Sequence, residues 1–98
     1  MIRHVVCFKL KDNSQENKEK TKEVLLSMKG KVALIKDIEV GVDFLGSARS
    51  YDVMLSVVLE DEAALDAYQQ DPYHCDVVKA HMHQVMEASV SMDYHLDD

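Results

Sequence analysis

The chain has 98 residues, of which 47% are hydrophobic and 30% are charged, a composition typical of one globular domain. Its formal net charge of −7 argues against nucleic acid as a partner, because such binding depends on Lys and Arg that neutralise phosphates. No segment approaches the roughly 20 apolar residues that span a bilayer, and the N-terminal apolar run is too short for a signal peptide. We therefore expect one cytoplasmic domain over residues 1–98 that contacts neither nucleic acid nor membrane.

Residues 2–10 alternate between two sets of side chains, which predicts a β-strand. The set expected to face the core is Ile2, His4, Val6, Phe8 and Leu10. The run Asp12-Asn13-Ser14 supplies caps for a helix that should reach about Met28, and Gly30 is placed to end it. Its expected inner face is Thr21, Val24, Leu25 and Met28.

Two strands are predicted in the middle of the chain, at about 34–43 and 51–60, joined by a loop that contains Gly46. Gly41 is expected to mark a β-bulge in the first of them. The second alternates regularly, which places every other side chain on one face. The residues of that face are Tyr51, Val53, Leu55, Val57 and Leu59.

Two helical segments and a strand are predicted for the rest of the chain. Asp61 should cap a short helix that reaches about Tyr68, and Pro72 then breaks the helix. Asp71 is a good N-cap for a second helix at about 73–88, followed by a strand at about 89–95 and a frayed end at 97–98. His83 is expected to face outward, whereas an inward stripe is formed by His74, Val78, His81, Met82 and Val85.

The element order β-α-β-β-α-β, with its second helix split, predicts a ferredoxin-like α+β fold: an antiparallel sheet with helices on one face. The first and third strands also carry apolar residues on the other face, namely Val5, Cys7, Met54 and Val58. One helical layer cannot cover both faces of the sheet. We therefore expect a homodimer through the sheet face, in which two sheets close into a dimeric α/β barrel.

A small polar site is predicted where His74, at the start of a helix, meets Tyr68 and the inward-facing His4. The helix N-terminus disfavours imidazolium, so we expect a neutral His74 that accepts a proton while the Tyr68 hydroxyl bonds a developing enolate. Pocket walls are expected from Val53, Leu55 and Val78, which suits a small apolar or aromatic ligand. The alternative is that His74 only caps the helix or fills the core.

The sequence carries no motif for a metal or a cofactor. Cys7 and Cys75 form no CxxC pair, and HExxH, GxSxG and phosphate-binding glycine loops do not occur. We therefore expect reduced thiols and no cofactor or metal ion.

Several segments together resemble the stress-responsive A/B barrel (Dabb) family. They are Ile2–Lys11, Glu39-Val40-Gly41, Tyr51-Asp52 and above all Tyr68-x-x-x-Pro72-x-His74. The resemblance implies a dimeric α+β barrel, consistent with the topology above. A plant member of the family closes a linear polyketide without a cofactor, and its catalytic His and Tyr match His74 and Tyr68, while a pocket His matches His4. That enzyme has a further pocket His where this chain has Val53.

These observations leave three functions open. The leading hypothesis is a protein that binds a small apolar compound and carries out cofactor-independent acid–base chemistry on it, as a polyketide cyclase does. The second is a non-enzymatic homodimeric stress-response or interaction protein. The third is a cofactor-independent monooxygenase, a chemistry that similar dimeric barrels host.

Overall fold

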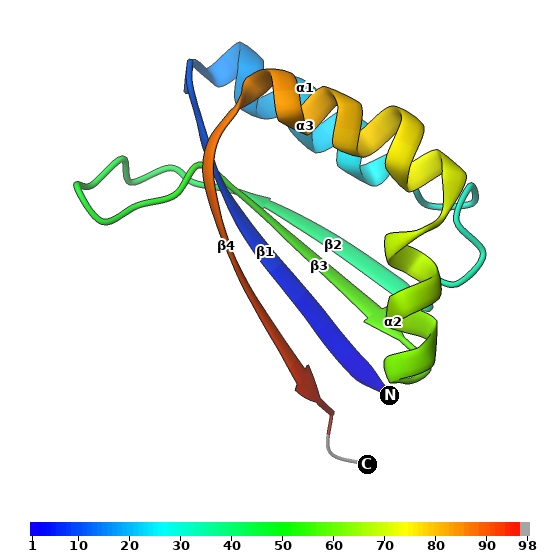
Figure 1. Cartoon of the computed structure of the whole chain (residues 1–98). Coiled ribbons are helices and arrows are strands. Elements are labelled where there is room, and N and C mark those ends of the chain that lie inside the picture. The colour runs from blue at the N-terminus through cyan, green and yellow to red at the C-terminus, as the bar shows by residue number, and fades with distance from the viewer. Residues whose placement is uncertain (97–98) are drawn as a thin grey trace.

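The chain folds into a four-stranded antiparallel sheet with helices on one face, as the computed structural model shows for residues 1–96 (Figure 1). The strands lie in the order β2-β3-β1-β4. This is the predicted ferredoxin-like α+β fold with its second helical region split. The elements in chain order are β1 (Ile2–Leu10), α1 (Gln15–Leu26), β2 (Asp37–Val42), β3 (Val53–Leu59), α2 (Glu62–Gln69), the π-helix η1 (His74–Lys79), α3 (Ala80–Val85) and β4 (Met86–His95).

The register of β1 decides which side chains meet under the helices. His4 lies opposite Val57 of β3 and Asp93 of β4, so all three side chains point to the same face of the sheet. The buried residues of β1 are Ile2, His4, Phe8 and Leu10, four of the five predicted to face the core; the fifth, Val6, is half-buried. The alternation in the sequence therefore identified the core face of β1 correctly.

The predicted caps set the limits of α1. The Ser14 hydroxyl accepts a hydrogen bond from the Asn17 N–H at 3.3 Å, and Gly30 takes a positive φ of 83° shortly after the helix ends. Thr21, Leu25 and Met28 are buried against the sheet, in agreement with the predicted inner face.

Two predictions about the middle strands need correction. β2 begins at Asp37 rather than near residue 34, because the preceding residues form a turn. Gly41 does not mark a bulge: the pairing of β2 with β3 runs without a shift from Asp37 to Val42. The irregularity of the sheet lies instead between Lys9 and Leu10, where β1 pairs with β4.

The second helical region also differs from the prediction. Its first part, His74–Lys79, is a π-helix, and α3 ends at Val85 rather than near residue 88. β4 begins at Met86 because Met86 pairs with Leu10, so tertiary pairing with β1 outweighs the helical pattern of these residues. The predicted fraying of Asp97 and Asp98 lies outside the described residues.

The face of the sheet opposite the helices is open. Three large apolar side chains of β4 are exposed there: Val90 (51%), Met92 (67%) and Tyr94 (41%). The half-buried side chains Val5, Cys7 and Met54 lie on the same face, as predicted. Among residues 1–96, no helix is long and apolar enough to cross a membrane.

Candidate functional site

A cavity of about 380 Å³ lies between the helical layer and the β1–β4 part of the sheet. Ligand pockets are usually roughly 300–1,000 Å³, so this volume suits a small organic molecule. Its apolar walls are Val6, Phe8, Leu25, Leu55, Val78, Met82 and Met86. Its polar lining residues are His4, Tyr68, Gln69, His74, Lys79, His83, Ser89 and Ser91.

Tyr68 lies between the two inward-facing histidines. Its ring stacks on His74, with ring centroids 4.3 Å apart, and meets His4 edge to face at 5.8 Å. The side chain is fully buried and its hydroxyl donates to the Met28 sulfur at 3.7 Å. Burial and the nearby Asp71 carboxylate raise the pKa of Tyr68 far above its usual value, so the phenol stays protonated. The structure thus brings His4, Tyr68 and His74 together, as the sequence predicted.

His4 is held by a carboxylate from the neighbouring strand. Its Nδ1 lies 2.5 Å from Asp93 Oδ1, across the β1–β4 pair. A carboxylate at Nδ1 fixes the tautomer with the proton on that nitrogen and leaves Nε2 free to accept a proton. No side-chain hydrogen bond formed within residues 1–96 uses His4 Nε2. The pair therefore has the arrangement of a general base with its orienting acid.

His74 lacks such a support. Asp71 Oδ1 accepts hydrogen bonds from the backbone N–H groups of Tyr73 (2.9 Å) and His74 (3.2 Å), which confirms Asp71 as the cap of this helical stretch. The imidazole Nδ1 is buried and has no hydrogen-bond partner among the described residues. Such orphaned buried groups are rare in folded proteins and cost about 1–3 kcal/mol.

The protonation state of His74 follows from its surroundings. Burial, and next the positive charge of Lys79, lower its pKa to about 4, while the Tyr68 backbone carbonyl opposes the shift. The imidazole is neutral at pH 7, as expected, although burial rather than the helix N-terminus is the main cause. A base with such a low pKa is weak, so His74 suits hydrogen bonding better than proton abstraction.

The predicted wall residues divide. Leu55 and Val78 line the cavity, whereas Val53 is buried between Phe8 of β1 and Val42 of β2 and does not reach it. His83 is exposed, as expected, and it also lines the cavity, which the sequence did not indicate. His81 does not line it, and its Nε2 lies 3.4 Å from the Thr21 hydroxyl.

Sequence reasoning missed two charged residues at this site. Asp93 reaches His4 only because of the register of β4, which the sequence does not reveal. Lys79 lies five residues after His74, a spacing that falls on different faces of an α-helix but on adjacent turns of a π-helix. A π-helical turn is itself frequent at functional sites, but it has no reliable sequence signal.

Metal binding finds no support in the part of the chain that the structure describes. No three His, Cys, Asp or Glu side chains gather there as a potential metal site. Cys7 and Cys75 are both free thiols and lie on different elements.

The chain belongs to the stress responsive A/B barrel domain (Dabb) family, whose model matches residues 2–96. No curated protein matches it in sequence. Among solved structures, a Dabb family protein from Mesorhizobium loti is 25% identical with a TM-score of 0.76, over 99% of this chain and 97% of that one. A dimeric ferredoxin-like protein of unknown function from Thermobifida fusca is 24% identical with a TM-score of 0.81, over 97% and 90%.

An enzyme also shares the fold. The hydroxynitrile lyase of Passiflora edulis is 15% identical, with a TM-score of 0.77 over 99% of this chain and 94% of that one. At this identity the likeness concerns the fold alone.

Proposed function

We propose that this member of the stress responsive A/B barrel family binds a small apolar or aromatic compound and catalyses cofactor-independent proton transfer on it. The observation that carries the proposal is the cavity of about 380 Å³ with apolar walls, into which two differently supported histidines converge around Tyr68. A few polar groups that meet inside a mostly apolar pocket are the usual features of a small-molecule site. One similar structure belongs to a lyase, which is consistent with such chemistry on this fold.

We assign the role of proton acceptor to His4. Asp93 holds its Nδ1 and stabilises the imidazolium that forms when Nε2 takes a proton from carbon. His74, whose pKa is about 4, stays neutral and can hydrogen-bond the oxygen that gains charge in the enolate. This assignment differs from the expectation based on the sequence, in which His74 was the base, Tyr68 bonded the enolate and His4 only lined the pocket.

The role of the Tyr68 hydroxyl stays a prediction. In this structure it donates to the Met28 sulfur, a weak acceptor. To reach an enolate it must leave that sulfur, a small loss compared with a charge-assisted hydrogen bond. The variant Tyr68→Phe removes the hydroxyl and keeps the ring that packs between the two histidines.

Proton transfer is measurable without knowledge of the natural substrate. The probe is phenylacetone, an aromatic ketone whose α-protons exchange slowly with D₂O in buffer, followed by proton NMR. We expect the protein to accelerate the exchange and His4→Gln to reduce that acceleration by about 10²–10⁴-fold. We expect His74→Gln and Tyr68→Phe to reduce it by about tenfold each, because each removes one hydrogen bond to the enolate.

The matched control is His95→Gln, since His95 is exposed near the end of β4, pairs with Glu62 and does not line the cavity. It should leave the exchange rate unchanged, and circular dichroism should show that every variant folds. Exchange no faster than in buffer would overturn the enzymatic proposal and favour the non-enzymatic stress or interaction protein. Equal losses in His4→Gln and His95→Gln would remove the assigned site.

The working form in this proposal is a homodimer joined through the open face of the sheet. The apolar side chains exposed there belong to β4, and Met54 and Val5 extend the surface across the sheet. Similar structures from Bacteroides fragilis and Thermobifida fusca are described as dimeric. Two such faces packed about a two-fold axis remove this surface from water in both copies.

A further inference from the structure

The charge at the cavity is opposite in sign to the net charge of the whole chain. The chain carries a formal net charge of −7, yet among residues 1–96 no Asp or Glu side chain lines the cavity. Of the residues that the structure describes, Lys79 alone lines the cavity with a permanent charge, and three of the five histidines line the cavity with it. A cavity with this lining attracts an anion rather than a cation.

Lys79 is held in place instead of extending into solvent. Its side chain is half-buried, and its Nζ donates to the backbone carbonyl of Gln69 at 3.1 Å. Gln69 ends α2, where a cation is favoured by the helix dipole. An ammonium group has three donors, so this bond leaves two for a ligand.

Two carboxylates beside residues of the site are already engaged. Asp71 caps the helical stretch that follows Pro72, and its Oδ1 accepts two backbone hydrogen bonds. Asp93 is paired with His4. Neither of them bonds Lys79, and Lys79 forms no salt bridge within residues 1–96, so the ammonium group keeps an unneutralised charge at the cavity.

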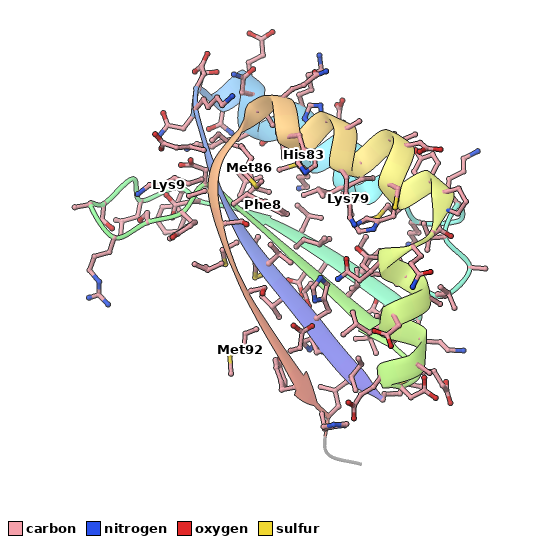
Figure 2. All side chains as sticks on the ribbon, in the orientation of Figure 1. Phe8, Lys9, Lys79, His83, Met86 and Met92 are labelled. Carbon is pink, nitrogen blue, oxygen red and sulfur yellow. The ribbon has the colours of Figure 1, made fainter. Side chains whose placement is uncertain are left out.

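His83 lies close to Lys79 along the same helical stretch. It is exposed and lines the cavity, one turn after Lys79 (Figure 2). Phe8 and Met86 belong to the apolar wall of the sheet side. Lys79 and His83 therefore supply polar donors from the helix side of the cavity, and Phe8 and Met86 supply apolar surface opposite them.

We infer that the ligand of this cavity is a carboxylate with an apolar or aromatic body, whose anionic head is bound by Lys79 with His83 beside it. This inference rests on the proposed function, because it names the substrate class of the same site. The body fills the space between the sheet and Val78 and Met82. The head group stays at the opening, where one charged partner is fixed in advance and water can satisfy the second oxygen.

The arrangement has a consequence for His74. The positive charge of Lys79 contributes to the low pKa of that imidazole. A carboxylate bound to Lys79 neutralises that charge, so ligand binding should raise the pKa of His74. Binding of the carboxylate and protonation of His74 are then coupled, and each favours the other.

The test compares two ligands of the same shape. The probes are naphthalene-2-carboxylate and naphthalene-2-carboxamide, which differ in charge and scarcely in size, titrated at pH 7.5 into the ¹⁵N-labelled full chain. We expect the carboxylate to bind about tenfold more tightly, with shifts at residues 74–83 and 89–91. Lys79→Met keeps the aliphatic stem, should remove the preference and should weaken carboxylate binding much more than carboxamide binding. Lys79→Arg should restore most of it.

The control is Lys29→Met, which removes an exposed lysine that does not line the cavity and should keep the tenfold preference. Equal affinity of the wild-type protein for both probes overturns this inference and leaves the proposed function standing. Shifts from neither probe at the cavity residues overturn the proposed function as well. Equal losses of carboxylate and carboxamide binding in Lys79→Met mean that Lys79 only caps α2 and shapes the pocket, which also overturns the inference.

Discussion

β3 and β4 both pair antiparallel with β1, yet their surroundings are opposite. Every residue of β3 except Met54 is buried, whereas every residue of β4 except Met86 is exposed. β3 lies inside the sheet, where α1 and α2 pack against it, and β4 forms the edge (Figure 1). The comparison shows that β3, on one side of β1, belongs to the filled core. β4, on the other side, offers two surfaces that could bind a ligand or a partner.

Those two surfaces lie on opposite faces of β4. Towards the helices, Ser89 and Ser91 line the cavity and Asp93 holds His4. On the other face, Val90 and Met92 are exposed, and Figure 2 shows Met92 pointing away from the helical layer. A single alternating strand thus serves the candidate site with one face and the candidate dimer interface with the other.

The largest expected effect comes from a charge placed on the exposed apolar face of β4. Met92→Glu places a charge at the centre of the proposed interface in both copies, and we expect the dissociation constant of the dimer to rise by about 100-fold or more. Met92 is 67% exposed in one chain, so the protomer should stay folded. Sedimentation equilibrium measures the change.

Gln84→Glu is the matched control, because it adds the same charge to an exposed position on α3. It should leave the dissociation constant as in the wild type. A wild-type protein that is monomeric at micromolar concentration contradicts the dimer, and so does a Met92→Glu variant that associates normally.

The next prediction concerns the pH dependence of stability. It tests whether His74 is shielded from water although the exposed edge strand β4 lies beside the cavity. His74 has a pKa of about 4 when folded and about 6.5 when unfolded. Between these values the unfolded chain binds a proton that the folded chain does not, so the free energy of unfolding falls as the pH drops from about 6.5 towards 4. The expected contribution is on the order of 3 kcal/mol, fully present above pH 6.5.

Urea denaturation at pH 7.0 and 4.5 measures this dependence. His74→Gln cannot titrate, so it should lose on the order of 3 kcal/mol less than the wild type between the two pH values. His95→Gln removes an exposed histidine and should behave as the wild type. If His74→Gln keeps the full pH dependence, water reaches the imidazole and its pKa is ordinary.

The smallest expected effect comes from larger side chains introduced on the two strands that flank β1. Val57 of β3 has no exposed surface, so Val57→Leu overpacks the core and should lower the free energy of unfolding by about 1–3 kcal/mol. Ser91 of β4 lines the cavity, where an added isobutyl group finds space, so Ser91→Leu should change stability by less than about 0.5 kcal/mol. Thermal unfolding of both variants tests the difference.

Ser91→Leu also occupies ligand space, and it should weaken binding of naphthalene-2-carboxylate. If side chains fill the cavity in solution, Ser91→Leu should be as destabilising as Val57→Leu, which would contradict this prediction. Unchanged ligand binding in Ser91→Leu places the ligand elsewhere.

Much of the fold was predictable because local patterns of the sequence agree with it. The alternation from Ile2 to Leu10, the Ser14 cap and the break at Pro72 each act over a few residues, and each corresponds to an observed boundary or face. The errors arose where distant contacts decide. The start of β4 at Met86 depends on its pairing with Leu10, and the regular path of Gly41 depends on its pairing with Met54.

The candidate site divides in the same way. The inward positions of His4 and His74 follow from strand and helix periodicity, and burial of Tyr68 follows from the short helix before Pro72. The pairing of His4 with Asp93 joins residues 89 positions apart, and no local pattern encodes that distance. The meeting of Lys79 with His74 needs a π-helical turn, which differs from an α-helix by a small energy that packing decides.

The sequence by itself determined the order of strands and helices, the core face of β1 and the inward positions of His4, Tyr68 and His74, because periodicity and capping are local properties of the chain. Only the tertiary structure decided which carboxylate supports which histidine, where the lone ammonium group lies and how much space stays empty between sheet and helices. Register, helical pitch and packing volume are set by the balance of many contacts over the whole fold, and no short segment contains that balance.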